Sequence, residues 1–199
     1  MSVRRAVLIL LGLGLLGCTN VRQEIFDPVS ANNIDPAVRI IRHDVVVPQE
    51  LTVSEANYYY PVVDIVWRDD PPGDRHAQVK AVVDDALDWG LAAFNRGRPV
   101  VVTLEVRRFH ALTQKARYTV GGVHSMKFTL LVWDAQTGSA IYGPVPIDGD
   151  LIALGGNKAI AADANGLTQK VRITQHLAGT IQRHLIQAGL GTYRGQNDG

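Results

Sequence analysis

Hydrophobic and polar residues alternate along the middle of the chain, in three segments between residues 99 and 147. Side chains in a β-strand point to opposite faces in turn, so this alternation predicts strands that place one face on a core. The positions that share the core-facing side are Val102, Leu104 and Val106 in the first segment, and Met126, Phe128, Leu130 and Val132 in the second. Burial of one face only is typical of an antiparallel sheet.

A tight turn separates the second segment from the third. Residues 134–138 read Asp-Ala-Gln-Thr-Gly, in which the aspartate can hydrogen-bond the turn backbone and the glycine can adopt the positive φ of a hairpin. The sequence therefore predicts a hairpin that joins residues 123–134 to residues 138–147. Pro144 and Pro146 cannot donate ladder hydrogen bonds, so we predict that the third strand is short or lies at an edge.

Two stretches with helical periodicity flank these strands. Apolar residues recur at helical spacing over residues 74–94, where Asp74 is the expected N-cap, and again over residues 167–188. Residues 38–47 are a β-branched run that predicts a further strand, and the short apolar run over residues 62–67 predicts another strand or a buried extended segment. The expected fold class is α+β, with an antiparallel sheet of four or five strands and two main amphipathic helices packed on one face.

The N-terminus has the pattern of an export signal. Two arginines precede an uninterrupted apolar and glycine run over residues 6–16, which is shorter than the roughly 20 residues needed to cross a bilayer. The run ends in the letters LLGC, which resemble the lipobox of bacterial lipoproteins. That resemblance implies cleavage after residue 17, a diacylglyceryl thioether on Cys18 and acylation of its amino group. The alternative is that Cys18 is a buried free thiol behind a chance signal-like start.

Cys18 is the only cysteine in the chain, so no internal disulfide is expected and the folded part must depend on its core. Three acyl chains would hold the protein on a membrane without a spanning helix. Thr19, not aspartate, follows Cys18, and the enterobacterial sorting rule then points to the outer membrane, facing the periplasm. We divide the chain into a signal peptide (1–17), a lipidated tether (18–36), a single α+β domain (37–191) and a flexible tail (192–199).

Charge is balanced over the chain, with 20 Lys and Arg against 19 Asp and Glu. Nucleic-acid binding needs an excess of basic residues, so a nucleic-acid partner is not expected. The expected partners are the membrane, through the lipid on Cys18, and an unknown envelope protein.

His110, Arg117 and His124 are the candidate ligand or partner contacts. The two histidines flank the connection over residues 110–122, and pairing of the adjacent strands would bring them near Arg117 as a small cationic cluster able to hold an anion. The alternative is that both histidines satisfy backbone groups at strand ends. The sequence has no HxxxH, HExxH or G-x-S-x-G motif, so we predict no metal, no cofactor and no catalytic residue.

Two other polar or aromatic groups precede the first helix. The adjacent carboxylates Asp69 and Asp70 stand before two prolines and are predicted to be solvated charges. The aromatic residues Tyr58, Tyr59, Tyr60 and Trp67 are predicted to cover the sheet, with an exposed binding surface as the alternative.

The order of several short motifs resembles an uncharacterised family of proteobacterial lipoproteins, a domain of unknown function. The motifs are Asp64-Ile65-Val66-Trp67, Gly73-Asp74-Arg75, Arg108-Phe109-His110-Ala111-Leu112-Thr113, Arg117-Tyr118, Gly121-Gly122-Val123-His124, Asp134-Ala135-x-Thr137-Gly138 and Lys170-Val171-Arg172-Ile173. The resemblance covers most of the chain after residue 18 and implies location, not activity.

Two functions are therefore considered. The first is a non-catalytic lipoprotein that presents its domain to a periplasmic partner and assists interaction or assembly. The second is an envelope ligand-binding protein or hydrolase that uses the His110, Arg117 and His124 region. Convergence of those three side chains on one reachable pocket would favour the second.

Overall fold

A computed structural model describes residues 28–194, and secondary structure extends almost to both ends of that range. In chain order the elements are η1 (Ala31–Asn33), β1 (Ile34–Pro36), β2 (Val38–Val46), β3 (Ile65–Val66), α1 (Arg75–Leu91), β4 (Arg98–His110), α2 (Gln114–Arg117), β5 (Gly122–Asp134), β6 (Ala140–Asp148), β7 (Leu151–Ala153), α3 (Asn157–Ala164), α4 (Gln169–Gln187) and β8 (Gly191–Tyr193).

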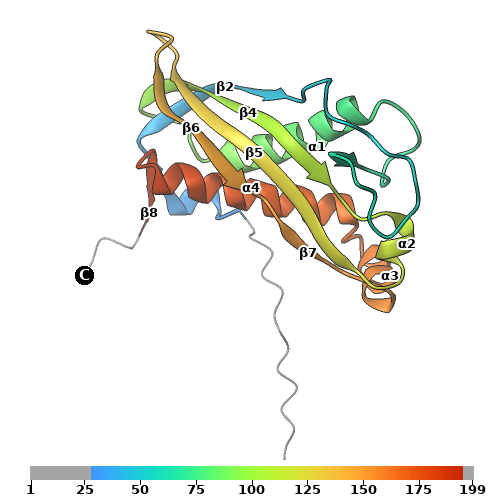
Figure 1. Cartoon of the computed structure of the whole chain (residues 1–199). Helices are drawn as coiled ribbons and strands as arrows, with labels where there is room; N and C mark the ends of the chain where they lie inside the picture. The colour runs from blue at the N-terminus through green and yellow to red at the C-terminus, as the bar shows by residue number, and fades with distance from the viewer. Residues whose placement is uncertain (1–27, 195–199) are drawn as a thin grey trace, which may run out of the picture.

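A mixed sheet of six strands forms the larger layer of the fold (Figure 1). Its strands follow the order β2-β4-β5-β6, while the short strands β3 and β7 pair with β4 and β5. Strand β4 is parallel to β2 and β3, whereas the β4–β5, β5–β6 and β5–β7 pairs are antiparallel. The α+β class is confirmed, but the prediction of a purely antiparallel sheet of four or five strands is wrong in strand number and in the direction of β2.

The parallel pairing of β2 and β4 has a physical cause in the helix between them. Helix α1 carries the chain from one end of the sheet back to the other, so β4 starts at the same end as β2 and runs in the same direction. Hydrophobic periodicity records which residues face the core and not the direction of a strand. The sequence pattern therefore predicted the long strands and the two main helices, but it gave no basis for the parallel direction of β2.

Helices α1 and α4 lie together against one face of the sheet (Figure 1). The core-facing residues predicted for β4 and β5 are buried there: Val102, Leu104, Val106, Met126, Phe128, Leu130 and Val132. The helices are very close at one crossing, because a Cβ atom on Gly90 would lie 2.6 Å from the carbonyl oxygen of Ala178. Only glycine permits that approach of the two backbones.

Side chains cap both long helices at their N-termini. The predicted cap of α1 is confirmed, since Asp74 accepts the backbone N–H of Ala77 at 3.1 Å. Thr168 accepts the backbone N–H of Val171 at 3.3 Å in the same way for α4. Each cap satisfies one of the donors that a helix start leaves unpaired, and so fixes where the helix begins.

The hairpin between β5 and β6 is formed as predicted. The Asp134 carboxylate accepts the backbone N–H groups of Gln136 and Thr137 at 2.8 and 2.6 Å, and Gly138 has a φ of +68°. Strand β6, which contains both prolines, lies at the end of the strand order. Here short-range turn chemistry was sufficient to specify the local structure.

Within residues 28–194, no helix packs on the second face of the sheet. Its outward side chains, which we call the open face, are Val101, Thr103 and Glu105 from β4 and Val123, Ser125, Lys127, Thr129, Leu131 and Trp133 from β5. All but the exposed Val123 are half-buried. The Trp133 indole N–H donates to the Thr103 hydroxyl at 3.2 Å, which holds the ring across the neighbouring strand. The sheet is thus covered on one side and accessible on the other.

Near the two ends of the described region, β1 and β8 form a separate two-stranded antiparallel sheet. Ile34 of β1 is fully buried in the core. Upstream, Val29 is fixed to α4, because Gln182 accepts its N–H at 2.6 Å and donates to its carbonyl oxygen at 3.1 Å. The ordered fold therefore includes residues that sequence analysis assigned to the tether (18–36) and to the tail (192–199). Cys18 and the predicted signal peptide lie outside the described residues.

Candidate functional site

His110 lies at the end of β4, where its side chain serves the backbone. It pairs with Ser125 across the β4–β5 ladder, and its Nε2 lies 2.8 Å from the carbonyl oxygen of Pro61. The ring also stacks on Tyr60, with 4.6 Å between centroids. Burial lowers the pKa of His110 from its ordinary value. The side chain is enclosed and neutral at pH 7, with its ring fixed in place.

His124 lies on the other face of the sheet. It follows Gly122 and Val123 in β5 and precedes Ser125, so strand alternation turns its side chain toward the helices and away from His110. Its Nδ1 accepts the backbone N–H of Leu112 at 3.3 Å. Burial lowers the pKa of His124 to about 3, and the positive charge of the nearby Arg172 adds to this effect. His124 is therefore a neutral ring that satisfies a backbone donor.

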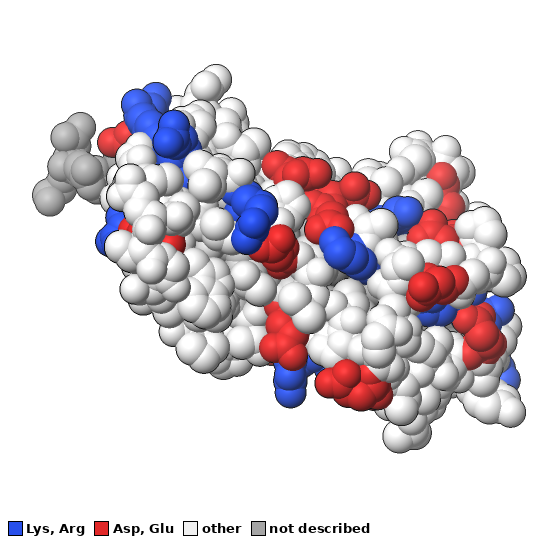
Figure 2. All heavy atoms as spheres, turned by 90° about the horizontal axis from the view of Figure 1, so that it is seen from above, with Lys and Arg blue, Asp and Glu red and all other residues white. Residues whose placement is uncertain are grey.

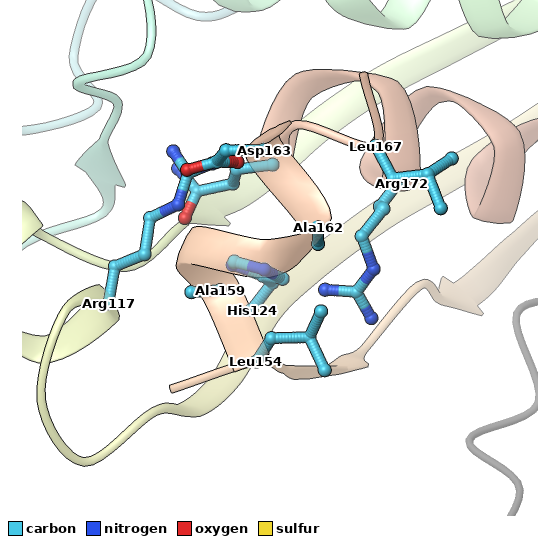
Figure 3. A pocket seen from close by; sticks show the side chains of 9 residues that line it. Arg117, His124, Leu154, Ala159, Ala162, Asp163, Leu167 and Arg172 are labelled. Carbon is cyan, nitrogen blue, oxygen red and sulfur yellow. The ribbon is translucent and has the colours of Figure 1, made fainter. Parts of the chain in front are cut away.

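Arg117, on α2, is neutralised by two carboxylates. Its guanidinium binds Asp69 on one side and Asp163 of α3 on the other, as Figure 3 shows for Asp163. Arg117 and both carboxylates are largely buried. A guanidinium already bound by two carboxylates has little attraction left for an external anion.

The structure brings together two of the three predicted contacts. Arg117 and His124 line one small cavity, together with Asp163, Gln169 and Arg172. Figure 3 shows the Arg172 guanidinium pointing from α4 toward His124 and Leu154. The cavity volume is about 10 Å³, close to the space of one water molecule. His110 is not among its walls, so the three side chains do not converge on one reachable pocket.

Asp69 and Asp70 were predicted to be solvated charges, and that prediction is wrong. Besides binding Arg117, Asp69 accepts the backbone N–H of Lys170 at 2.9 Å, at the start of α4. Asp70 accepts the Trp67 indole N–H at 2.7 Å and the Lys170 ammonium at 3.0 Å. The two carboxylates join the loop after β3 to α4. Their shared partner Lys170 is 100 positions or more away in sequence, where no local pattern could indicate it.

The prediction that the aromatic residues before α1 cover the sheet is confirmed for Trp67 and wrong for the three tyrosines, which are exposed. Tyr58, Tyr59 and Tyr60 are 67%, 51% and 61% exposed, whereas Trp67 is fully buried. Tyr60 accepts a hydrogen bond from Arg108 at 2.8 Å, and Lys115 lies 4.6 Å above the Tyr59 ring. The tyrosines stand at the end of the open face that His110 and Ser125 mark.

The side chains described above make contacts with backbone groups and with opposite charges. Across residues 28–194, no group of three or more His, Cys, Asp or Glu side chains is placed to hold a metal ion. His110 and His124 contact backbone groups, and Arg117 binds the carboxylates of Asp69 and Asp163. The geometry suits the positioning of α2, α3 and α4 around the end of the sheet.

Comparison with known families places the chain. A model described as "Family of unknown function (DUF6778)" matches residues 38–196. The chain belongs to this family. The match covers most of the sequence and confirms the resemblance to an uncharacterised family.

The remaining comparisons add little about function. The chain matches no curated protein. One solved structure that is similar in part belongs to a Caulobacter crescentus CB15 protein inferred to be a lipoprotein, with 21% identity, 59% of this chain and 84% of that chain covered, and a TM-score of 0.28. A TM-score of that size does not establish a common fold. In the part of the chain that the structure describes, no helix has the length and apolar character needed to cross a bilayer.

Proposed function

We propose that this family member is a lipoprotein of the bacterial outer membrane, anchored through Cys18, whose domain is a non-catalytic binding module facing the periplasm. The lipobox-like LLGC sequence and the apolar run before it support the anchor. One structural relationship supports the binding role: the chain leaves the domain on its helical side, while the open face lies on the opposite side of the sheet.

The exit of the tether supports this orientation. Val29 is bound through its N–H and its carbonyl oxygen to Gln182. The chain therefore lies against α4 at the N-terminal start of the described region. Helix α4 covers the core-facing side of the sheet. A lipid reached through residues 18–27 would therefore leave the open face turned away from its attachment point.

The open face has features of a protein-binding surface. A groove of about 330 Å³ lies on it, with Trp133, Val101 and Thr103 in its walls and the oppositely charged Arg42 and Asp44 at one side. From Trp133 to Ser125 the face is about 26 Å long at the usual rise per strand residue. The exposed tyrosines stand at the far end. Tryptophan, tyrosine and arginine are enriched where proteins bind one another.

Surface charge supports a protein partner and gives no support to nucleic acid. In the view from above, Lys and Arg side chains lie next to Asp and Glu side chains (Figure 2). Pairs such as Lys80–Asp84 at 2.6 Å, and Lys127 with Asp148 at 2.7 Å, neutralise individual charges. A surface with both signs interspersed creates no extended field for a polyanion.

The anchor is tested by intact-mass analysis and membrane fractionation of the full chain expressed in a Gram-negative host, beside the variant Cys18→Ala. We expect the wild type to carry the acyl mass and to enter the outer-membrane fraction, and the variant to lack both properties. An unmodified, soluble wild-type protein would overturn the anchor.

The binding role is tested separately, by placing a photo-crosslinking amino acid at Thr129 on the open face. The control site is Gln187, which is exposed on α4. Discrete adducts with the same envelope protein are expected from position 129 and not from position 187. Equal adducts from both positions, or none from position 129 in membranes that hold the lipidated protein, would contradict the open face as the binding surface.

A further inference from the structure

The small cavity beside His124 contains a buried acceptor with no donor. Gln169 of α4 is 4% exposed, and its side-chain oxygen Oε1 has no hydrogen-bond partner among the described residues. Buried polar atoms are almost always paired, either with protein or with ordered water. A hydrogen-bond donor located in the cavity that Gln169 lines would pair with its Oε1.

Arg172, one turn further along α4, brings a charge to the same cavity. The side chain is 5% exposed, and its Nη2 donates to the carbonyl oxygen of Ile152 at 3.3 Å. A guanidinium has five N–H donors, and this bond uses one of them. The nearby carboxylates of Asp69 and Asp163 both bind Arg117. The cavity is therefore lined both by donors of Arg172 and by the unpaired acceptor of Gln169.

His124 adds a further donor to the wall. Because its Nδ1 accepts the backbone N–H of Leu112, the proton of the neutral ring is on Nε2. The remaining lining residues include Leu154, Ala159, Ala162 and Leu167, which offer apolar side chains. A ligand here must both donate and accept hydrogen bonds.

We propose that this cavity binds one water molecule, which donates to Gln169 Oε1 and accepts from the Arg172 guanidinium. The volume of about 10 Å³ fits this ligand, since a single buried water needs about 10–15 Å³. An anion would suit Arg172, but it could not donate to Gln169. The water is a structural ligand that joins two side chains of α4 beside His124 of β5, independently of the proposed binding role.

The test is a high-resolution crystal structure of the full chain in detergent, with bromide-soaked crystals for anomalous diffraction. We expect one ordered water within hydrogen-bond distance of Gln169 Oε1 and of an Arg172 nitrogen, and no bromide peak. A bromide peak in the cavity, or an empty cavity with the amide of Gln169 bound elsewhere, would overturn the proposal.

A pair of variants tests the role of Gln169. Gln169→Leu keeps the size of the side chain and removes the acceptor, and Gln187→Leu makes the same change at an exposed position of α4. We expect the water to be lost or displaced in the first and retained in the second. Retention of the same water in Gln169→Leu would contradict the assignment. If that variant does not fold, water-to-protein NOEs at the Arg172 Nε–H of the wild type give the same answer: a rigidly bound water is expected, and its absence overturns the proposal.

Discussion

Asp69 and Lys170 are 101 positions apart in the chain, yet the Asp69 carboxylate accepts the backbone N–H of Lys170 at 2.9 Å. The other oxygen of the same carboxylate binds Arg117. A carboxylate at a helix N-terminus satisfies an unpaired N–H and complements the positive end of the helix dipole. Asp69 thus fixes α2 and the start of α4 relative to the loop after β3.

Replacement of Asp69 by asparagine removes the charge and keeps the size. Arg117 retains Asp163, so we expect the free energy of unfolding to fall by about 2 kcal/mol, the scale of one largely buried hydrogen bond to a charged group. Urea unfolding followed by circular dichroism measures the change. The control is Asp88→Asn, at a side chain that is 74% exposed, where a change within about 0.5 kcal/mol is expected. Equal stability of the two variants would contradict the role of Asp69.

Gly90 tests the close approach of α1 and α4. Alanine is favoured over glycine inside a helix by about 1 kcal/mol, which alone would make Gly90→Ala stabilising. Here the new Cβ would meet backbone atoms of Ala178 at 2.6 and 3.0 Å, which cannot move without separating the helices. We expect a net loss of about 1–3 kcal/mol, as for other overpacked cores. Thermal unfolding of Gly90→Ala beside wild type measures it.

Gly73→Ala is the matched control for that substitution. Its Cβ would lie 3.1 Å from Nε2 of Gln78, the flexible end of a side chain that can shift. A near-neutral effect is expected there. If Gly90→Ala proves as stable as Gly73→Ala, the helices have room to separate and the packing argument fails.

How much the sequence could predict depends on the distance over which each contact acts. The Asp134 turn, the Asp74 cap and the alternation from Met126 to Val132 are local features, and each was predicted correctly. Asp69 depends on a partner 101 positions away, and its role was missed. The direction of β2 depends on a crossover, which side-chain alternation does not record.

The candidate site shows the same limit in a different form. Pairing of the strands around residues 110–122 was the condition for bringing the two histidines together, and β4 does pair with β5, which places His110 next to Ser125. His124 is only one residue further along, but this single step turns its side chain to the opposite face. An exact register would have been needed to see that Arg117 and His124 share a cavity that His110 does not reach. The exposure of the tyrosines was missed because a run of aromatic residues looks the same in sequence whether it packs on the sheet or faces solvent.

His124 makes stability depend on pH. Burial lowers its pKa to about 3 from an ordinary value of 6.5. Below pH 6.5 the unfolded chain binds a proton at this position that the folded protein does not bind until about pH 3. The contribution of His124 to the free energy of unfolding is therefore fully present above pH 6.5 and is lost as the pH falls toward 3. At pH 4.5 the loss from this one group is about 2–3 kcal/mol.

The variant His124→Gln isolates that contribution, because the glutamine oxygen can still accept the Leu112 N–H and does not titrate. The difference in unfolding free energy between pH 7 and pH 4.5, measured in urea, should be smaller in the variant. Burial also lowers the pKa values of His110 and His176, so part of the acid sensitivity remains. A variant with the full wild-type pH dependence would show that His124 is not the buried neutral group described.

Gln182 controls how the tether leaves the domain. Its amide is 2% exposed and binds both the N–H and the carbonyl oxygen of Val29, so Gln182→Ala leaves two backbone groups without their partner. We expect a loss of about 1–2 kcal/mol in unfolding free energy. The segment before β1 should also open more readily, because its contact with α4 is lost.

Limited proteolysis of the full chain, with cleavage positions read by mass spectrometry, should show faster cutting at residues 28–33 in the variant. The same change at the exposed Gln187 should leave the cutting rate unchanged. Equal rates at residues 28–33 in wild type and Gln182→Ala would mean that Val29 is not fixed on α4, and the proposed orientation of the open face would lose its structural support.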